Sequence, residues 1–169
     1  LRAVSETPGP RQVTLARLHE LGIRPDRELG QNFLVDDNLL GVIDRLAQLE
    51  PTDCVLEIGA GVGVLTAHLA RRTALVHAIE IDRRLGVALE RTLEGLDNVR
   101  LVWGDAMRLD LAELSPAPNA FVANLPYSVA APLVLDSIAG LPNVERWCVL
   151  VQHEIADRLT ARPGDALYG

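Results

Sequence analysis

The chain has 169 residues, of which 49% are hydrophobic, 4% aromatic and 23% charged, with a net charge of −7 and a pI near 5.0. This size and composition fit one globular domain whose core is built from aliphatic side chains. They argue against a membrane-spanning segment, because no apolar run reaches the roughly 18 residues that a bilayer requires. The acidic balance also argues against a basic surface devoted to nucleic acid.

Hydrophobic runs and turn residues alternate regularly along the chain. Apolar spacing and helix-ending residues predict helices over residues 14–21, 37–49, 64–71, 82–93, 132–138 and 153–160. Short apolar runs predict strands over 54–58, 75–79, 99–103, 120–123 and 146–151, and an extended arm is expected over 25–33. Strands that alternate with helices indicate an α/β fold with a doubly wound, mostly parallel sheet.

The cysteines and histidines suggest neither a disulfide nor a metal site. Cys54 and Cys148 both lie in apolar runs, which predicts buried free thiols in a reducing compartment. The four histidines lack the spacing of metal ligands, so we expect no metal. The first ten residues show no basic region followed by an apolar stretch, and no secretion signal is expected.

Polar and glycine residues directly follow four of the predicted strands. These are the Gly59–Gly63 loop, Glu80, Asp105 and Asn124. Open parallel sheets bind ligands at the carboxyl ends of their strands, near the point where the strand order reverses. We therefore expect these residues to line one crevice.

The glycine loop favours S-adenosylmethionine over a dinucleotide. Its glycines lie at positions 59, 61 and 63, and Val64 stands where the dinucleotide fingerprint has its third glycine. Glu57, just before the loop, would repel a pyrophosphate but tolerates the zwitterionic methionine end of S-adenosylmethionine. Glu80 would accept hydrogen bonds from ribose hydroxyls and Asp105 from the adenine amine. Alternatively, Glu80 ends its strand in solvent and Asp105 caps a helix.

Asn124-Leu125-Pro126-Tyr127 has the features that methylation of an aromatic amine requires. The Asn124 side-chain oxygen and the Leu125 carbonyl can accept from an adenine N6–H and direct its lone pair toward a methyl donor. Pro126 fixes the backbone, and Tyr127 offers a face on which an extruded base stacks. The alternative is an ordinary strand-ending turn, since Asn and Pro favour turns.

Several motifs, in order, resemble the ribosomal RNA adenine dimethyltransferase family of the kasugamycin-sensitivity type. The resemblance covers about residues 15–169. It is carried by segments 29–34 (LGQNFL), 57–66 (EIGAGVGVLT), 80–82 (EID), 104–106 (GDA), 124–127 (NLPY) and 151–154 (VQHE).

The resemblance implies a Rossmann-like class I methyltransferase core over residues 37–169, preceded by a helical arm and cofactor-closing motif over 1–36. It implies a monomeric cytoplasmic enzyme. The enzyme would dimethylate two adjacent adenines in small-subunit ribosomal RNA, as a step of ribosome biogenesis. Asn124, Leu125, Pro126 and Tyr127 would hold the target adenine. The residues that would contact S-adenosylmethionine are Gln31, Asn32, Leu34, Gly59, Gly61, Glu80, Asp105 and Asn124.

The sequence also departs from this family. The family's sheet ends with two further strands and a small helical domain that helps to bind RNA, and this chain ends at Tyr168-Gly169 before either. We therefore expect a fragment whose fifth strand is an exposed sheet edge. Weak or absent RNA methylation by this piece alone is expected.

Three alternatives remain open at this point. The macrolide-resistance type of the same fold methylates a large-subunit adenine, although Gly30 and Leu125 favour the small-subunit type. A nicotinamide-dependent oxidoreductase would explain the fold and glycine loop but not residues 124–127. A ribosome-assembly factor with a vestigial site would need no catalysis.

Overall fold

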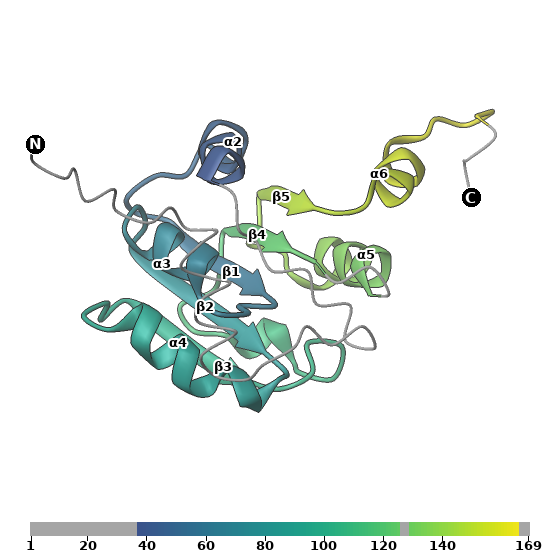
Figure 1. The fold of residues 1–169 in the computed structure, drawn as a ribbon. Helices are drawn as coiled ribbons and strands as arrows, with labels where there is room; N and C mark the ends of the chain where they lie inside the picture. Colours follow the sequence, from purple (N-terminus) through teal and green to yellow (C-terminus); the bar gives the residue numbers. More distant parts are fainter. Residues whose placement is uncertain (1–36, 126–128, 166–169) are drawn as a thin grey trace, which may run out of the picture.

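A computed structural model describes residues 37–125 and 129–165, and these residues form an α/β fold (Figure 1). The strands are β1 (Cys54–Ile58), β2 (Leu75–Glu80), β3 (Val99–Trp103), β4 (Ala120–Asn124) and β5 (Arg146–Leu150). The helices are α2 (Asp37–Ala47), α3 (Val64–Ala70), α4 (Gly86–Leu93), α5 (Ala130–Gly140) and α6 (His153–Thr160), with short 3-10 turns η1 (Arg83–Leu85) and η2 (Leu111–Glu113).

The five described strands form one sheet in the order β3-β2-β1-β4-β5, and every pair is parallel. This confirms the doubly wound parallel sheet expected from the sequence. The strand order reverses between β1 and β4, where a crevice at the carboxyl edge is expected. In the described sheet β5 is an edge strand, as the sequence also predicted.

Alternate residues of the strands build two apolar layers, one on each side of the sheet. Val55 and Val76 point to the face covered by α2, α3 and α4, where Ile43, Leu69 and Leu89 are buried. The other face is covered by α5 and the segment before β4 (Figure 1). Its buried residues include Leu56, Ile79, Phe121, Leu133 and Val134.

Most predicted elements agree with the structure to within one or two residues. The helix predicted over 82–93 is divided, because Asp82 accepts the Arg84 N–H at 3.0 Å and caps a 3-10 turn that precedes α4. The α5 helix extends beyond the predicted 132–138 in both directions, and η2 was not predicted. The helix predicted over 14–21 and the arm over 25–33 lie outside the described residues.

The cysteine prediction is wrong in one respect. Both cysteines are free and Cys54 is buried, but Cys148 is only half-buried because β5 is an edge strand. In the portion of the chain that the structure describes, no helix is long and apolar enough to cross a membrane.

Candidate active site

The ends of four strands and the start of the glycine loop form one row across the carboxyl edge of the sheet. Glu80 lies opposite Trp103 of β3, and Asn124 lies opposite Leu150 of β5. The β1–β2 pairs run up to Ile58–Ile79, directly before Gly59 and Glu80, and the β1–β4 pairs run up to Leu56–Phe121, three residues before Gly59 and Asn124. Because these strands are parallel and adjacent, Glu80, the glycine loop and Asn124 lie at the same edge of the sheet.

The glycine loop is bound to the end of β2 through its backbone. The N–H groups of Gly59 and Ala60 both donate to the Ile79 carbonyl, at 2.8 and 3.1 Å. Gly59, Gly61 and Gly63 have φ angles of 83°, 61° and 84°, a region that side chains other than glycine rarely adopt. The three glycines thus permit a tight turn that leads directly into α3.

Glu80 is buried, with 4% of the residue exposed, so the alternative of a solvated strand end is wrong. One carboxylate oxygen accepts the Gly61 N–H and the other accepts the Asp82 N–H, both at 2.8 Å. Burial raises the pKa of Glu80, although these hydrogen bonds favour its charged form. The two oxygens of a carboxylate have about four lone pairs in all, so Glu80 retains capacity for a ligand hydroxyl.

Glu57 is 1% exposed, and neither of its oxygens has a hydrogen bond partner among the described residues. Burial raises the pKa of Glu57 to about 8, the nearby Thr66 hydroxyl lowers it, and the charge of Glu80 raises it. An unpartnered buried carboxyl is costly in a folded protein. A positively charged ligand group beside it would relieve that cost.

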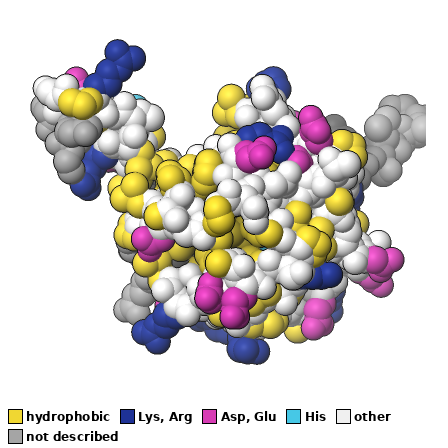
Figure 2. All heavy atoms as spheres, turned by 180° about the vertical axis from the view of Figure 1, so that it is seen from behind, with side chains coloured by type: hydrophobic (Ala, Val, Ile, Leu, Met, Phe, Trp, Pro, Cys, Tyr) yellow, Lys and Arg dark blue, Asp and Glu magenta, His cyan; other side chains and the backbone are white. Residues whose placement is uncertain are grey.

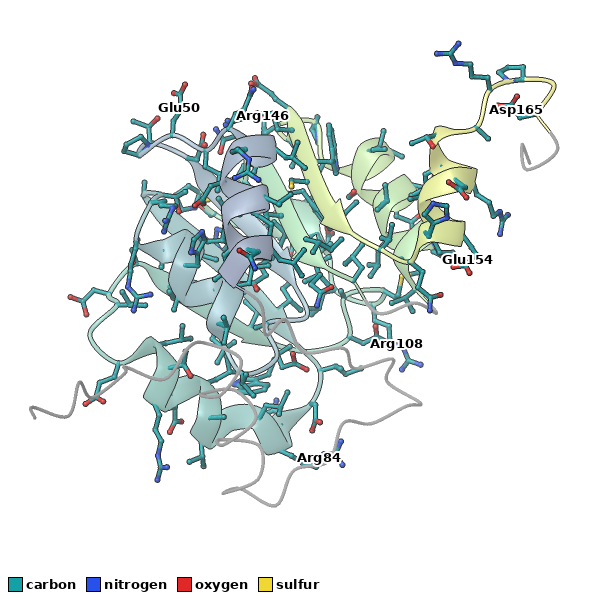
Figure 3. All side chains as sticks on the ribbon, turned by 45° about the horizontal axis from the view of Figure 1, so that its top comes forward. Glu50, Arg84, Arg108, Arg146, Glu154 and Asp165 are labelled. Carbon is teal, nitrogen blue, oxygen red and sulfur yellow. The ribbon has the colours of Figure 1, made fainter. Side chains whose placement is uncertain are left out.

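Asp105 is engaged with the turn that follows it, and no helix begins there, so the alternative of a helix cap is wrong. Its Oδ1 accepts the Met107 N–H at 3.0 Å, and its Oδ2 lies 3.4 Å from the Arg108 Nε. The carboxyl remains 37% exposed and can accept a further hydrogen bond. Figure 3 shows Arg108 and Arg84 at the opposite end of the sheet from Glu50 and Arg146.

Asn124 ends β4 half-buried and Leu125 is buried at 2% exposure, with its N–H donating to the Leu150 carbonyl at 3.1 Å. This bond extends the β4–β5 ladder by one residue and holds the start of the predicted tetrapeptide against β5. The other predicted site residues, Pro126, Tyr127, Gln31, Asn32 and Leu34, lie outside the described residues.

The structure also places residues at this edge that the sequence analysis did not single out. Asp82 is buried and binds the Arg84 guanidinium through both oxygens, at 2.8 and 2.7 Å. Ile81 and Met107 are 50% and 42% exposed, and each lies within two residues of a predicted ligand carboxylate. In the sequence, the signal for Ile81 and Met107 was a large apolar residue one or two positions after the acidic residue that follows or ends a strand.

The sequence pattern of the ribosomal RNA adenine dimethylase family matches residues 24–169. The chain belongs to the ribosomal RNA adenine dimethylase family. Membership of this family decides against the nicotinamide-dependent oxidoreductase. A ribosomal RNA small subunit methyltransferase A from Rubrobacter xylanophilus is 49% identical over 146 residues, which cover 86% of this chain and 55% of that protein. The chain thus spans about half the length of the curated relatives it matches.

Solved structures of two methyltransferases resemble the fold of this family member. A dimethyladenosine transferase from Plasmodium falciparum has a TM-score of 0.72 and 31% identity, covering 82% of this chain and 50% of that one. The 23S rRNA methyltransferase ErmE has a TM-score of 0.67 and 36% identity, covering 76% of this chain and 51% of that one.

The described residues fit S-adenosylmethionine. The unpartnered Glu57 carboxyl suits the positively charged methionine end, and the free lone pairs of Glu80 suit ribose hydroxyls. A Cβ at Gly63 would come within 3.2 Å of Leu89 and Thr92, so a side chain would disturb the loop. Among the described residues, no three His, Cys, Asp or Glu side chains gather as metal ligands.

Proposed function

We propose that this chain is the cofactor-binding and catalytic part of an enzyme that dimethylates the N6 of adjacent adenines in small-subunit ribosomal RNA, using S-adenosylmethionine. The observation that carries the proposal is that β2, β1 and β4 are adjacent and parallel, so that Glu80, the glycine loop and Asn124 all lie at the carboxyl edge of the sheet. Residues for the cofactor and for the target amine then share one edge of the sheet.

On the cofactor side, Glu80 would accept hydrogen bonds from the ribose, and Asp105 would accept one from the adenine amine. The exposed side chains of Ile81 and Met107 would contact the two faces of the adenine ring. Gly59 and Gly61 let the backbone approach the ligand closely. Gln31, Asn32 and Leu34 are proposed to close over the cofactor on the strength of the motif resemblance.

On the substrate side, Asn124 and Leu125 would accept hydrogen bonds from the N6 amine through a side-chain amide oxygen and a backbone carbonyl. The bound cofactor supplies an electrophilic methyl group. Pro126 would hold the backbone, and Tyr127 would stack on the extruded base. Catalysis would rest mainly on positioning, which lowers barriers by about 7–11 kcal/mol in well-oriented systems.

Calorimetric titration of the chain with S-adenosylmethionine and, separately, with a nicotinamide dinucleotide tests the cofactor assignment. We expect binding of the first and none of the second. The reaction is tested by replacing Asn124 with Ala in the full-length protein. The expected result is about a 100-fold loss of methyl transfer to small-subunit RNA, since misplacing a reacting group costs that much. Unchanged transfer would overturn the catalytic assignment.

The likeness to ErmE supports a second candidate, a large-subunit ribosomal RNA adenine methyltransferase. The curated relatives favour the small subunit, because they are named as small-subunit enzymes at 49% and 44% identity. Mass spectrometry of ribosomal RNA from cells that lack the protein decides between the two. Either substrate would place the protein in the cytoplasm. A separate role in ribosome assembly would be revealed by an Asn124→Ala variant that no longer transfers methyl groups but still supports assembly.

A further inference from the structure

Glu57 differs from the other carboxyls in the part of the chain that the structure describes. Both of its oxygens are buried without a hydrogen bond partner, a state that it shares there only with the Thr66 hydroxyl and one His77 ring nitrogen. It lies two residues before Gly59, on the strand that leads into the glycine loop. The carboxyl therefore lies on the strand that leads into the proposed cofactor site, with the Thr66 hydroxyl as a nearby polar group.

The groups around Glu57 offer it no positive charge. Glu57 faces the α2–α4 side of the sheet, as Val55 and Glu80 do, and Glu80 adds a second negative charge on the neighbouring strand. From α3 the nearby group is the Thr66 hydroxyl, and from α4 the buried side chains are Ala88 and Leu89. His68 of α3 and Arg72, which follows α3, both contact Asp44 of α2 instead, at 2.7 and 3.0 Å.

We propose that Glu57 is a proton switch coupled to cofactor binding: it is protonated in the ligand-free protein and releases its proton to solvent when the positively charged end of S-adenosylmethionine binds. The inference rests on the proposed function. In the step, the carboxyl O–H bond breaks, the proton passes to water, and the carboxylate remains beside the cationic ligand. The raised pKa of Glu57, about 8, agrees with a protonated starting state.

Isothermal titration calorimetry at pH 7, in buffers of different ionisation enthalpy, measures the protons released on binding. We expect the wild-type protein to release up to about one proton more per S-adenosylmethionine than the Glu57→Gln variant. The amino group of the cofactor is already mostly protonated at pH 7, because the pKa of an α-amino group is about 8, so it takes up little further proton on binding. Glu90→Gln, at an exposed position on α4, is the matched control and should behave as wild type. Equal proton release by wild type and Glu57→Gln would overturn the inference.

The same switch makes cofactor affinity depend on pH. Relative to Glu57→Gln, the affinity of the wild-type protein should rise by up to about tenfold per pH unit toward pH 8 and then level off. The sign follows because deprotonation of Glu57 becomes easier as the pH rises toward its pKa. A constant affinity ratio between pH 6 and 8 would contradict the proposal.

Infrared difference spectroscopy tests the starting state without requiring that the variant bind cofactor. The band of a protonated carboxyl should be present in the ligand-free wild-type protein at pH 7, absent in Glu57→Gln, and lost on saturation with S-adenosylmethionine. An ionised Glu57 in the ligand-free protein, or a band that persists on saturation, would overturn the switch alone. Failure of the wild-type protein to bind S-adenosylmethionine would overturn the proposed function as well.

Discussion

At the scale of single residues, Glu57 and Glu80 show how two buried carboxyls one strand apart acquire different properties. Glu80 accepts two backbone N–H groups at 2.8 Å, whereas Glu57 accepts none. Hydrogen bonds from backbone amides favour a charged carboxylate, and burial without them favours the neutral acid. Glu80 is therefore suited to accept hydrogen bonds from ligand hydroxyls, whereas the protonation of Glu57 is sensitive to the charge of a bound ligand.

Glu57 should also impose a pH dependence on the stability of the ligand-free protein. Its folded-state pKa of about 8 lies above the usual 4.5, so the folded state holds a proton that the unfolded state has released between these values. The free energy of unfolding is therefore highest at low pH, where Glu57 is neutral in both states. It falls as the pH rises through this window, by about 1.4 kcal/mol per pH unit at most.

Chemical denaturation of wild type and Glu57→Gln between pH 5 and 8 measures this effect. The free energy of unfolding of the wild-type protein should fall relative to that of the variant as the pH rises. Parallel curves would show that Glu57 does not titrate in this range.

At the scale of elements, the glycine loop joins β1 to α3 and also sets how closely α3 and α4 pack. Gly63 and Gly95 both have positive φ, 84° and 76°, but a Cβ at Gly63 would lie 3.2 Å from Leu89 and Thr92, whereas one at Gly95 would have no neighbour within 4 Å. The two positions therefore separate the cost of backbone conformation from the cost of packing.

Gly95→Ala should destabilise the protein by about 1 kcal/mol, the cost of a left-handed alanine. Gly63→Ala should cost about 1–3 kcal/mol more, because overpacking adds to the same backbone strain, and should also weaken cofactor binding. Thermal unfolding and calorimetry of both variants measure these effects. Equal destabilisation would mean that the α3–α4 contact adjusts without cost.

A polar cluster joins three strands at the opposite, amino-terminal edge of the sheet. Asp53 accepts from the Asn119 side chain at 2.8 Å and forms an ion pair with Arg146 at 2.6 Å. Burial raises the pKa of Asp53, but these bonds and the Glu50 N–H outweigh it, so the pKa is lowered overall. The cluster links the starts of β1, β4 and β5.

Asp53→Asn should cost about 2 kcal/mol of stability near pH 7, since it replaces charged hydrogen bonds with neutral ones. A lowered pKa contributes stability that is present above the unfolded-state value and lost as the pH falls through the folded-state value. The difference between wild type and variant should therefore shrink below about pH 4. Denaturant titrations at pH 7 and pH 3 test this, and a gap that stays constant would contradict it.

At the scale of the whole molecule, the described fold combines the proposed cofactor site, at the carboxyl ends of the strands, with β5 as an edge strand of the sheet. Figure 2 shows α6 standing out from the body above a surface with many hydrophobic side chains. Leu135 and Ile138 of α5 are 58% and 55% exposed. The chain also spans about half the length of the curated relatives it matches.

These 169 residues alone should bind S-adenosylmethionine but methylate ribosomal RNA far more slowly than a full-length relative does. The reason is that their net charge of −7 provides little electrostatic attraction for RNA phosphates. Turnover on small-subunit RNA, compared with that of the Rubrobacter relative, measures the difference. Comparable turnover would refute the expectation.

The sequence by itself determined the order of the elements and the set of polar residues that follow the strands. These features depend on local patterns: apolar runs indicate strands, and parallel strands place their carboxyl ends at one edge. The Gly59–Gly63 loop, Glu80 and Asn124 could be assigned to one edge without coordinates. Positions 31–34 and 126–127 remain predictions from the motif resemblance.

Only the tertiary structure decided how buried each polar side chain is and which group it contacts. The bond from Gly61 to Glu80 spans 19 positions, and the pair formed by Asp53 and Arg146 spans 93. The lack of a hydrogen-bond partner for the Glu57 oxygens depends on which side chains of the neighbouring described segments face it, and the half-buried state of Cys148 depends on strand order. No local pattern encodes such contacts, because they arise when segments distant in sequence pack together.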